Sequence, residues 1–286
     1  MKKYISLLRL DKPIGFMLLF WPCAWGFAHV SFYIQVNNLW LYYLFLFFIG
    51  SILMRSAGCV YNDIVDKRID QKVLRTKNRP LASGLVSINV AWKIIITLCL
   101  FSFLILIQFN FKAILFGLSS SILIMIYPFM KRITFWPQLF LGIVFNWGII
   151  LSWLVFNDTI NQSIILLYLS AVFWTLGYDT IYGLQDLEDD IKIGVKSTAI
   201  IFSDFIKSFI CIVYFVSFIL LVFSVYVTLP KFDPSICFFL LPSLLLIYQI
   251  LNVVKKNSKK NLFLFKLNNY YGLSIFVIQI LVFHNA

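Results

Sequence analysis

Two acidic stretches carry the residues that could do chemistry: GCVYNDIVDKRID over residues 58–70, and YDTIYGLQDLEDD over residues 178–190. Residues four apart share one face of an α-helix, so such spacing would align oxygen ligands in a row. Mg²⁺ prefers oxygen and usually takes only a few protein carboxylates, the rest of its shell being water and substrate phosphate. Two such rows suit two ions that clamp a diphosphate leaving group. The predicted metal ligands, spaced four apart within each stretch, are Asn62, Asp66, Asp70, Asp186 and Asp190.

A pair of opposite charges lies seven residues before these rows. Arg55 precedes Asn62 by seven, and Asp179 precedes Asp186 by seven, so the two sets repeat with an offset of 124 residues. On a helix seven residues correspond to about 10 Å, which places Arg55 deep in an apolar segment. A cation there is costly and marks a functional hypothesis. Arg55 is expected either to bind a substrate carboxylate or to pair with Asp179 in a structural bridge.

Basic residues follow the acidic stretches. Arginine grips phosphate bidentately and lysine acts as a point charge, so these residues could hold a diphosphate. The alternative is that they only set the orientation of the chain in a membrane. The predicted diphosphate-binding residues are Lys77, Arg79, Lys131 and Arg132, with Lys192 and Lys196 nearby.

The elements that must position these residues are membrane spans. The chain has 286 residues, of which 61% are hydrophobic, and its mean hydropathy is +0.91. A bilayer is spanned by about 20 apolar residues, and backbone in hydrocarbon must be helical. We therefore predict an all-α bundle of about nine transmembrane helices, near residues 14–36, 39–60, 90–109, 112–130, 136–156, 162–181, 206–229, 235–254 and 266–284.

The net charge of +12 is explained by topology. With the N-terminus inside, 21 of the 24 lysines and arginines lie on the cytoplasmic side, as the positive-inside rule requires. Nucleic acid is therefore not an expected partner, the C-terminus should lie outside, and both acidic stretches should face the cytoplasm. We predict one polytopic domain over residues 1–286, with a cytosolic cap made by loops 61–89 and 182–205.

The five cysteines show no CxxC or paired spacing, so neither a disulfide framework nor a cysteine metal site is expected. We interpret them as small buried apolar residues.

Several strings resemble the UbiA superfamily of intramembrane prenyltransferases, and among its members the 4-hydroxybenzoate polyprenyltransferases most. The resemblance runs from about residue 9 to residue 200. It is carried by RLDKPIG (9–15), FWPCAWG (20–26), RSAGCVYNDIVDKRID (55–70), RTKNRPLASG (75–84), YPFMKRITFWPQ (127–138) and YDTIYGLQDLEDDIKIGVKSTA (178–199).

The resemblance implies a Mg²⁺-dependent enzyme of ubiquinone biosynthesis in the inner membrane of a bacterium. It would move a polyprenyl group from its diphosphate to the ring carbon ortho to the hydroxyl of 4-hydroxybenzoate. Asp66 and Asp190 would be essential through the metal, and Arg79 and Lys131 would hold the diphosphate. Arg55 would contact the acceptor, and Asp179 is expected to orient the phenol, to accept its proton, or only to balance Arg55.

Two alternatives stay open. A member of the same superfamily could use a naphthoate, homogentisate or haem acceptor. A divalent-cation transporter is the other class, but it should carry polar residues through both leaflets, and the outer halves of these spans hold almost no charge.

Overall fold

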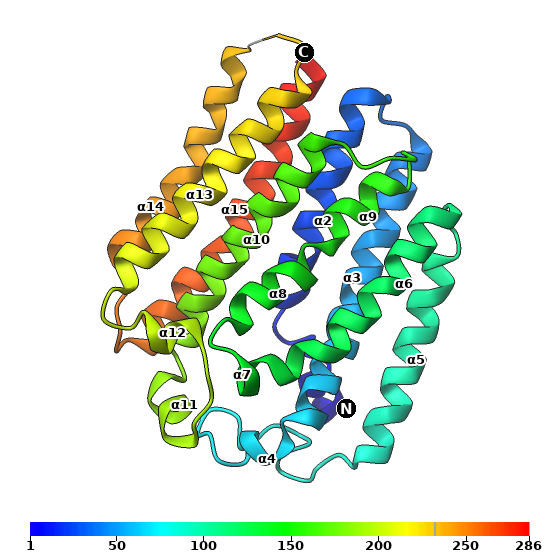
Figure 1. Cartoon of the computed structure of the whole chain (residues 1–286). Helices are drawn as coiled ribbons and strands as arrows, with labels where there is room; N and C mark the ends of the chain where they lie inside the picture. Colours follow the sequence, from blue (N-terminus) through cyan, green and yellow to red (C-terminus); the bar gives the residue numbers. More distant parts are fainter. Residues whose placement is uncertain (232, 286) are drawn as a thin grey trace.

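The computed structural model describes residues 1–231 and 233–285, and these ranges contain helices and no strand (Figure 1). Among the described residues, eight helical spans are long and apolar enough to cross a membrane. Both ends of each span lie within five residues of the ends of a predicted span. They are α2 (Ile14–Tyr33), α3 (Asn38–Val65), α5 (Ile88–Leu106), α6 (Phe111–Ile126) continued by η1 (Tyr127–Phe129) and α7 (Met130–Ile133), α8 (Pro137–Phe145) with α9 (Trp147–Leu154), α10 (Gln162–Gly183), α13 (Ile206–Thr228), and η2 (Pro234–Phe239) with α14 (Leu240–Asn252).

The ninth predicted span falls in α15 (Ser258–Asn285), which is long enough to cross but is not among the eight apolar ones. Its polar side chains Asn261, Asn268 and Gln279 are fully buried. Asn268 accepts a hydrogen bond from the Trp174 indole of α10 (2.8 Å) and donates one to Gln249 of α14 (3.1 Å). The polarity of α15 is thus directed into the bundle. The number of crossings and their orientation stay predictions.

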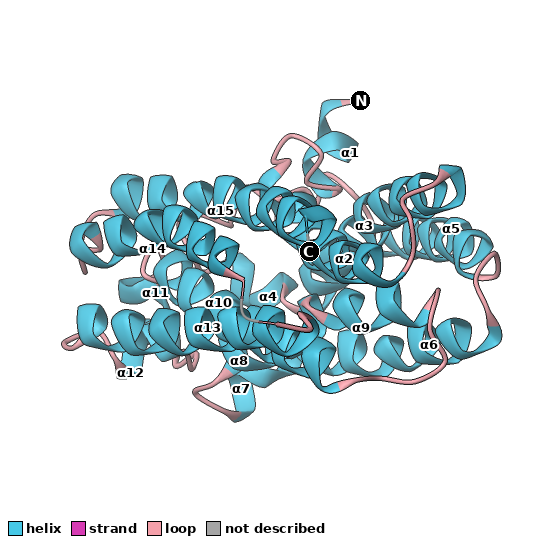
Figure 2. Cartoon of the chain, turned by 90° about the horizontal axis from the view of Figure 1, so that it is seen from above, coloured by secondary structure: helices cyan, strands magenta, loops and turns pink. Residues whose placement is uncertain are grey.

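The helices form two facing rows when the bundle is seen along its axis (Figure 2). One row includes α14, α15, α2 and α3, and the facing row includes α13, α10, α9 and α6. Helix α10 packs against α13, α8 and α15, while α2 packs against α15, α9 and α3. Helices α5 and α6 lie at the edge and have one buried residue each, Ala91 and Ala113, so their apolar faces point outward, as suits lipid.

The two ends of the bundle differ in construction. At one end the connections are short, and an asparagine caps the next helix by accepting a backbone N–H: Asn37 for α3, Asn110 for α6 and Asn161 for α10. Each such cap stabilises a helix by about 1 kcal/mol. The opposite end, at the bottom of Figure 1, holds the N-terminus and the short helices of the long loops. These short helices include α4 (Lys67–Asp70), α11 (Leu187–Ile193) and α12 (Thr198–Ile201).

The cysteines depart from the prediction. All five are free, and Cys23 and Cys59 are buried, but Cys99, Cys211 and Cys237 are exposed. Interpreting all five as buried was wrong because the outer face of a span borders lipid, where a thiol is as compatible as in the core.

Candidate active site

The first acidic stretch lies at a break in the helix. Asp66 ends α3 with φ −94° and ψ 4°, and the short helix α4 follows at once. Helical hydrogen bonds nevertheless continue across the break: the Asp66 N–H donates to the carbonyl of Asn62, and the Asp70 N–H donates to that of Asp66, both at 2.8 Å. The four-residue row predicted from the spacing is therefore kept along the backbone, although no single helix carries it.

The second acidic stretch has the same construction. Helix α10 ends at Gly183, Asp186 adopts φ −108° and ψ 7°, and α11 begins at Leu187. The Asp190 N–H donates to the Asp186 carbonyl at 2.8 Å. Asp186 is thus the backbone counterpart of Asp66, at an offset of 120 residues. The predicted repeat exists as a structure, but its register differs by one helical turn from the 124-residue offset read in the sequence.

Lys131 joins the two stretches. Its ammonium pairs with the fully buried carboxylate of Asp66, and Arg132 approaches the same carboxylate at 3.4 Å. Lys131 also interacts electrostatically with Asp190. The backbone N–H of Lys196, in the loop after α11, donates to the Lys131 carbonyl at 2.9 Å and fixes this segment beside the second stretch.

A second bridge is made by the loop after α4. The Arg75 guanidinium donates to Asp186 at 2.7 Å and to the hydroxyl of Tyr182 at 3.1 Å. Its neighbour Leu74 donates its backbone N–H to Asp189 at 3.1 Å. The two acidic stretches, far apart in sequence, therefore lie close together at one end of the bundle.

A third group of charges surrounds Asp63. Arg79 contacts both Asp70 (2.8 Å) and Asp63 (3.1 Å). The Arg9 guanidinium donates to both carboxylate oxygens of Asp63, each at 2.9 Å. Asp63 is 2% exposed. This group joins the N-terminal segment and the first acidic stretch to the loop that follows α4. Within it, the Arg79 guanidinium is paired with carboxylates of the protein itself.

The donor set fits a hard cation that is shared with substrate. Among the residues that the structure describes, no three His, Cys, Asp or Glu side chains gather closely enough to hold an ion alone. Mg²⁺ needs few protein ligands when phosphate and water complete its shell. Burial and the neighbouring Asp186 raise the pKa of Asp190 to about 6, against the opposing effect of Lys131 and Arg75. A cation bound beside Asp190 would favour its charged form.

The deeper charged pair does not form the direct bridge that was one alternative. No ion pair joins Arg55 to Asp179 among the described residues, although the two interact electrostatically. The Arg55 guanidinium instead lies 5.2 Å from the centre of the Phe145 ring, and its Nε is buried without a hydrogen-bond partner in the described structure. Tyr127 of η1 interacts electrostatically with both charges.

The structure gathers most of the predicted residues and adds three. Lys77 stands apart, exposed and without an ion pair among the described residues. The additions are Arg75, Asp63 and Arg9. Arg75 belonged to the same basic string as Lys77, and Asp63 lies outside the four-residue row. Arg9 belongs to the string RLDKPIG, but no spacing in the sequence relates it to Asp63.

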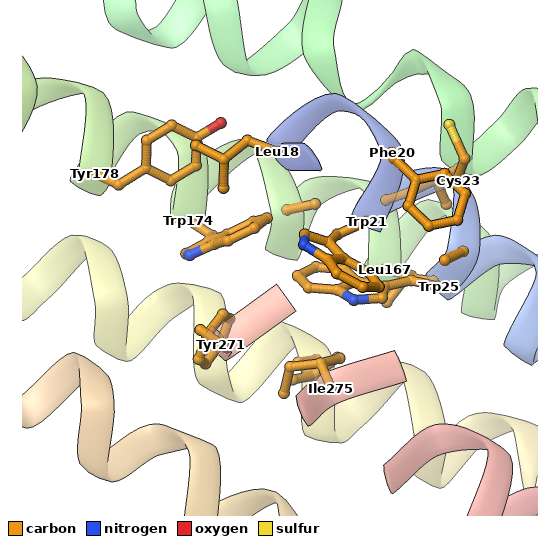
Figure 3. Packing of buried hydrophobic residues seen from close by; sticks show 14 of the residues in the cluster. Leu18, Phe20, Trp21, Cys23, Trp25, Leu167, Trp174, Tyr178, Tyr271 and Ile275 are labelled. Atoms are coloured by element: carbon orange, nitrogen blue, oxygen red, sulfur yellow. The ribbon is translucent and has the colours of Figure 1, made fainter. Parts of the chain in front are cut away.

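An aromatic cluster fills the bundle beside α10 (Figure 3). The ring centres of Trp25 and Trp174 lie 4.9 Å apart, and the centre of the Trp174 ring lies 5.0 Å from that of Tyr178 and 5.4 Å from that of Tyr271. Trp147 stacks separately on Phe116 of α6. Tyr182, which binds Arg75, and Tyr178 both contact the ring of Phe265, so aromatic rings continue from the charged end into the apolar interior.

Comparison with curated proteins finds similar proteins that are named 4-hydroxybenzoate polyprenyltransferase or octaprenyltransferase. The chain is 48% identical to "4-hydroxybenzoate polyprenyltransferase, mitochondrial" of Drosophila pseudoobscura pseudoobscura over 206 residues, which are 71% of this chain. It is 49% identical to the Arabidopsis thaliana protein of the same name over 203 residues, which are 70% of this chain. The matches cover 51% and 49% of those proteins, so the chain spans about half the length of these relatives. The "4-hydroxybenzoate octaprenyltransferase" of Pseudomonas aeruginosa (strain LESB58) is 39% identical over 238 residues, which cover 83% of this chain and 77% of the relative.

Solved structures share the fold. The apo structure of a UbiA homolog from Aeropyrum pernix K1 has a TM-score of 0.77 at 23% identity and covers 93% of this chain and 97% of its own. A UbiA homolog from Archaeoglobus fulgidus bound to GPP and Mg²⁺ has a TM-score of 0.65 at 19% identity and covers 96% of this chain and 99% of its own. The model of the UbiA prenyltransferase family matches residues 19–270, most of the sequence, and the chain therefore belongs to that family.

Proposed function

We propose that the protein transfers a polyprenyl group from its diphosphate to the ring carbon ortho to the hydroxyl of 4-hydroxybenzoate, in ubiquinone biosynthesis. The observation that carries the proposal is the convergence of both acidic turns on Lys131 and Arg75, at one end of an apolar bundle. Such a site suits a ligand with a charged head and a lipid-soluble tail. The names of the relatives supply the acceptor.

In this proposal Asn62, Asp66 and Asp70 hold one Mg²⁺, and Asp186 and Asp190 hold another. Bound there, the metal would neutralise charge on the departing diphosphate. A structural neighbour bound to GPP and Mg²⁺ supports this choice of metal and donor head. Asp66 and Asp190 would be the residues on which turnover depends most, since Asp66 pairs with Lys131 and Asp190 is the member of its row that interacts with it electrostatically.

The cations of the chain would act on the diphosphate itself. Lys131 and Arg132 pair with Asp66, and Arg79 pairs with Asp70. With a metal held by these carboxylates, the three cations would be free to donate to phosphate oxygens. Lys77 would join them from its exposed position. Preorganised cations of this kind stabilise charge that develops on a leaving group.

The acceptor would lie between this head group and Arg55. Its carboxylate would face Arg55, and Asp179 would orient the phenol or receive its proton. The aromatic cluster that includes Trp25 and Trp174 would exclude water and stabilise the allylic cation through the ring faces. We place the protein in a bacterial inner membrane, as one domain. The end of the bundle that carries α4, α11, α12 and the proposed site would lie in the cytoplasm.

The test is product analysis by mass spectrometry. Purified protein would receive mixed polyprenyl diphosphates, Mg²⁺ and an equimolar mixture of 4-hydroxybenzoate, a dihydroxynaphthoate and homogentisate. Prenylated 4-hydroxybenzoate as the main product, lost on chelation, is the expected result. A different main product would transfer the protein to another acceptor class, and turnover that survives chelation would reject the metal roles.

A further inference from the structure

Two buried polar atoms remain unpaired two turns inside the bundle from the acidic site. They are Nε of Arg55 and the hydroxyl oxygen of Tyr178, neither of which has a hydrogen-bond partner among the described residues. Tyr178 is 1% exposed. Its own helix brings the Thr175 hydroxyl near; that oxygen accepts from the Asn146 amide at 2.8 Å, and its remaining proton can be directed to the Tyr178 oxygen, which leaves the phenolic proton without an acceptor. Native interiors rarely leave such groups unpaired, so each calls for an explanation.

The two atoms lie beside the same helix, α2. Tyr178 interacts electrostatically with both Arg55 and Asp179. In Figure 3 its hydroxyl is directed away from Trp174 and toward Leu18 of α2. One turn earlier on α2, Gly15 lies against Arg55, where an added Cβ would come within 2.9 Å of Nε. The same helix therefore passes beside both unpaired atoms, and Gly15 leaves room for the guanidinium.

The chemistry of the pair points to an anion with two acceptor oxygens. A guanidinium Nε–H can only donate, and a tyrosine hydroxyl donates readily to a charged acceptor. Asp179 does not fill this role, because no ion pair joins it to Arg55 among the described residues. A planar carboxylate offers one oxygen to each donor.

We propose that Tyr178 is an acceptor-binding residue, whose hydroxyl and the Nε–H of Arg55 each donate to one oxygen of the acceptor carboxylate. The inference rests on the proposed function and adds to it the group that, with Arg55, selects an aromatic acid over a neutral phenol. An ester or amide in the same pocket would leave at least one of the two donors poorly paired.

The first test is Tyr178→Phe, measured by steady-state kinetics on the whole protein in detergent or liposomes. The KM for 4-hydroxybenzoate should rise about 10- to 100-fold, the effect of losing one hydrogen bond to a charged group. The KM for the polyprenyl diphosphate should stay within about twofold. The preference for 4-hydroxybenzoate over its methyl ester should fall by a similar factor, because the ester never had the full carboxylate contact.

Tyr168→Phe is the matched control. Tyr168 lies on the same helix, but its hydroxyl is bonded to the Ile143 carbonyl at 3.0 Å. This variant should lose stability and keep the acceptor KM. Tyr178→Phe should show the reverse. Without acceptor it should lose no stability, because its hydroxyl has no partner to lose. When 4-hydroxybenzoate is added without donor, its melting temperature should rise less than that of the wild type.

Three results would overturn the inference: an unchanged acceptor KM in Tyr178→Phe, an equal loss for acid and ester, or a variant that unfolds without acceptor. The last would reveal an internal partner for the hydroxyl. Failure of the wild type to prenylate 4-hydroxybenzoate would instead reject the proposed function. The thermal shift with the acid alone would still decide the assignment of Tyr178 as a carboxylate donor.

Discussion

Replacing Lys131 with methionine should have opposite effects on metal binding and on turnover. The Lys131 ammonium neutralises Asp66, which is fully buried and is a proposed metal ligand. Before substrate arrives, lysine and Mg²⁺ therefore compete for the same carboxylate. Once the diphosphate is bound, the lysine is expected to serve the leaving group instead. Methionine keeps most of the length and apolar character of the side chain and removes only the charge.

The magnitude follows from the contacts of Asp66. Removing one partner of a buried ion pair costs about 3–5 kcal/mol. Arg132 remains at 3.4 Å, but its side chain is 43% exposed, so it compensates only in part. We expect a loss of about 2–3 kcal/mol in the free energy of unfolding without metal. Affinity for Mg²⁺ should rise about tenfold, or 1.4 kcal/mol, and turnover should fall about 100- to 1000-fold with the loss of a preorganised cation.

The assay combines thermal unfolding in detergent across a Mg²⁺ titration with turnover at saturating substrates. Lys207→Met, which removes an exposed charge at the start of α13, is the control and should change neither. Weaker Mg²⁺ binding by Lys131→Met would show that the lysine does not compete with metal at Asp66. Normal turnover would show that it does not act on the leaving group, and either result would refute the reasoning.

Three further predictions concern single side chains. Asp190→Asn should lower turnover at least about 1000-fold while the protein keeps its melting temperature, because Asp190 has no ion pair in the described structure to lose; retained turnover would remove it from the metal site. Arg55→Gln should raise the KM of the acceptor about 100-fold and leave that of the donor nearly unchanged, and the opposite pattern in initial-rate measurements would contradict the carboxylate assignment. Asp63→Asn should cost about 3 kcal/mol of unfolding free energy, since Arg9 and Arg79 lose their shared counter-charge, yet its Mg²⁺ titration should match the wild type; a lost response to Mg²⁺ would make Asp63 a ligand.

Periodicity and hydropathy predicted much of this architecture. The spans are defined by apolar length, and eight of their positions agree closely with helices of the structure. The four-residue spacing of Asp66 and Asp70 is a local property of helical backbone, so it survives even the break at Asp66. Arg55 could be selected from the sequence because a cation in an apolar segment is energetically costly.

What the sequence could not supply are contacts between distant segments. Arg9 binds Asp63 across 54 residues, and Arg75 binds Asp186 across 111, and neither pairing leaves a periodic trace. The register of the repeat was displaced by one turn because the helix breaks at Asp66 and Asp186 depend on backbone conformation, which spacing does not reveal. Tyr178 was hidden for another reason: an aromatic residue in a span is normally packing, and only its unpaired hydroxyl distinguishes it.

The inward polarity of α15 bears on how the chain is assembled after synthesis. A helix that carries Asn261, Asn268 and Gln279 gains little from entering lipid alone. The partners of Asn268, Trp174 and Gln249, are made earlier in translation, so they can already be in place when α15 leaves the ribosome. Docking of α15 is then expected to follow the assembly of α10 and α14, and cells that degrade unassembled membrane proteins would detect a defect in Asn268 as a shortened lifetime of the protein.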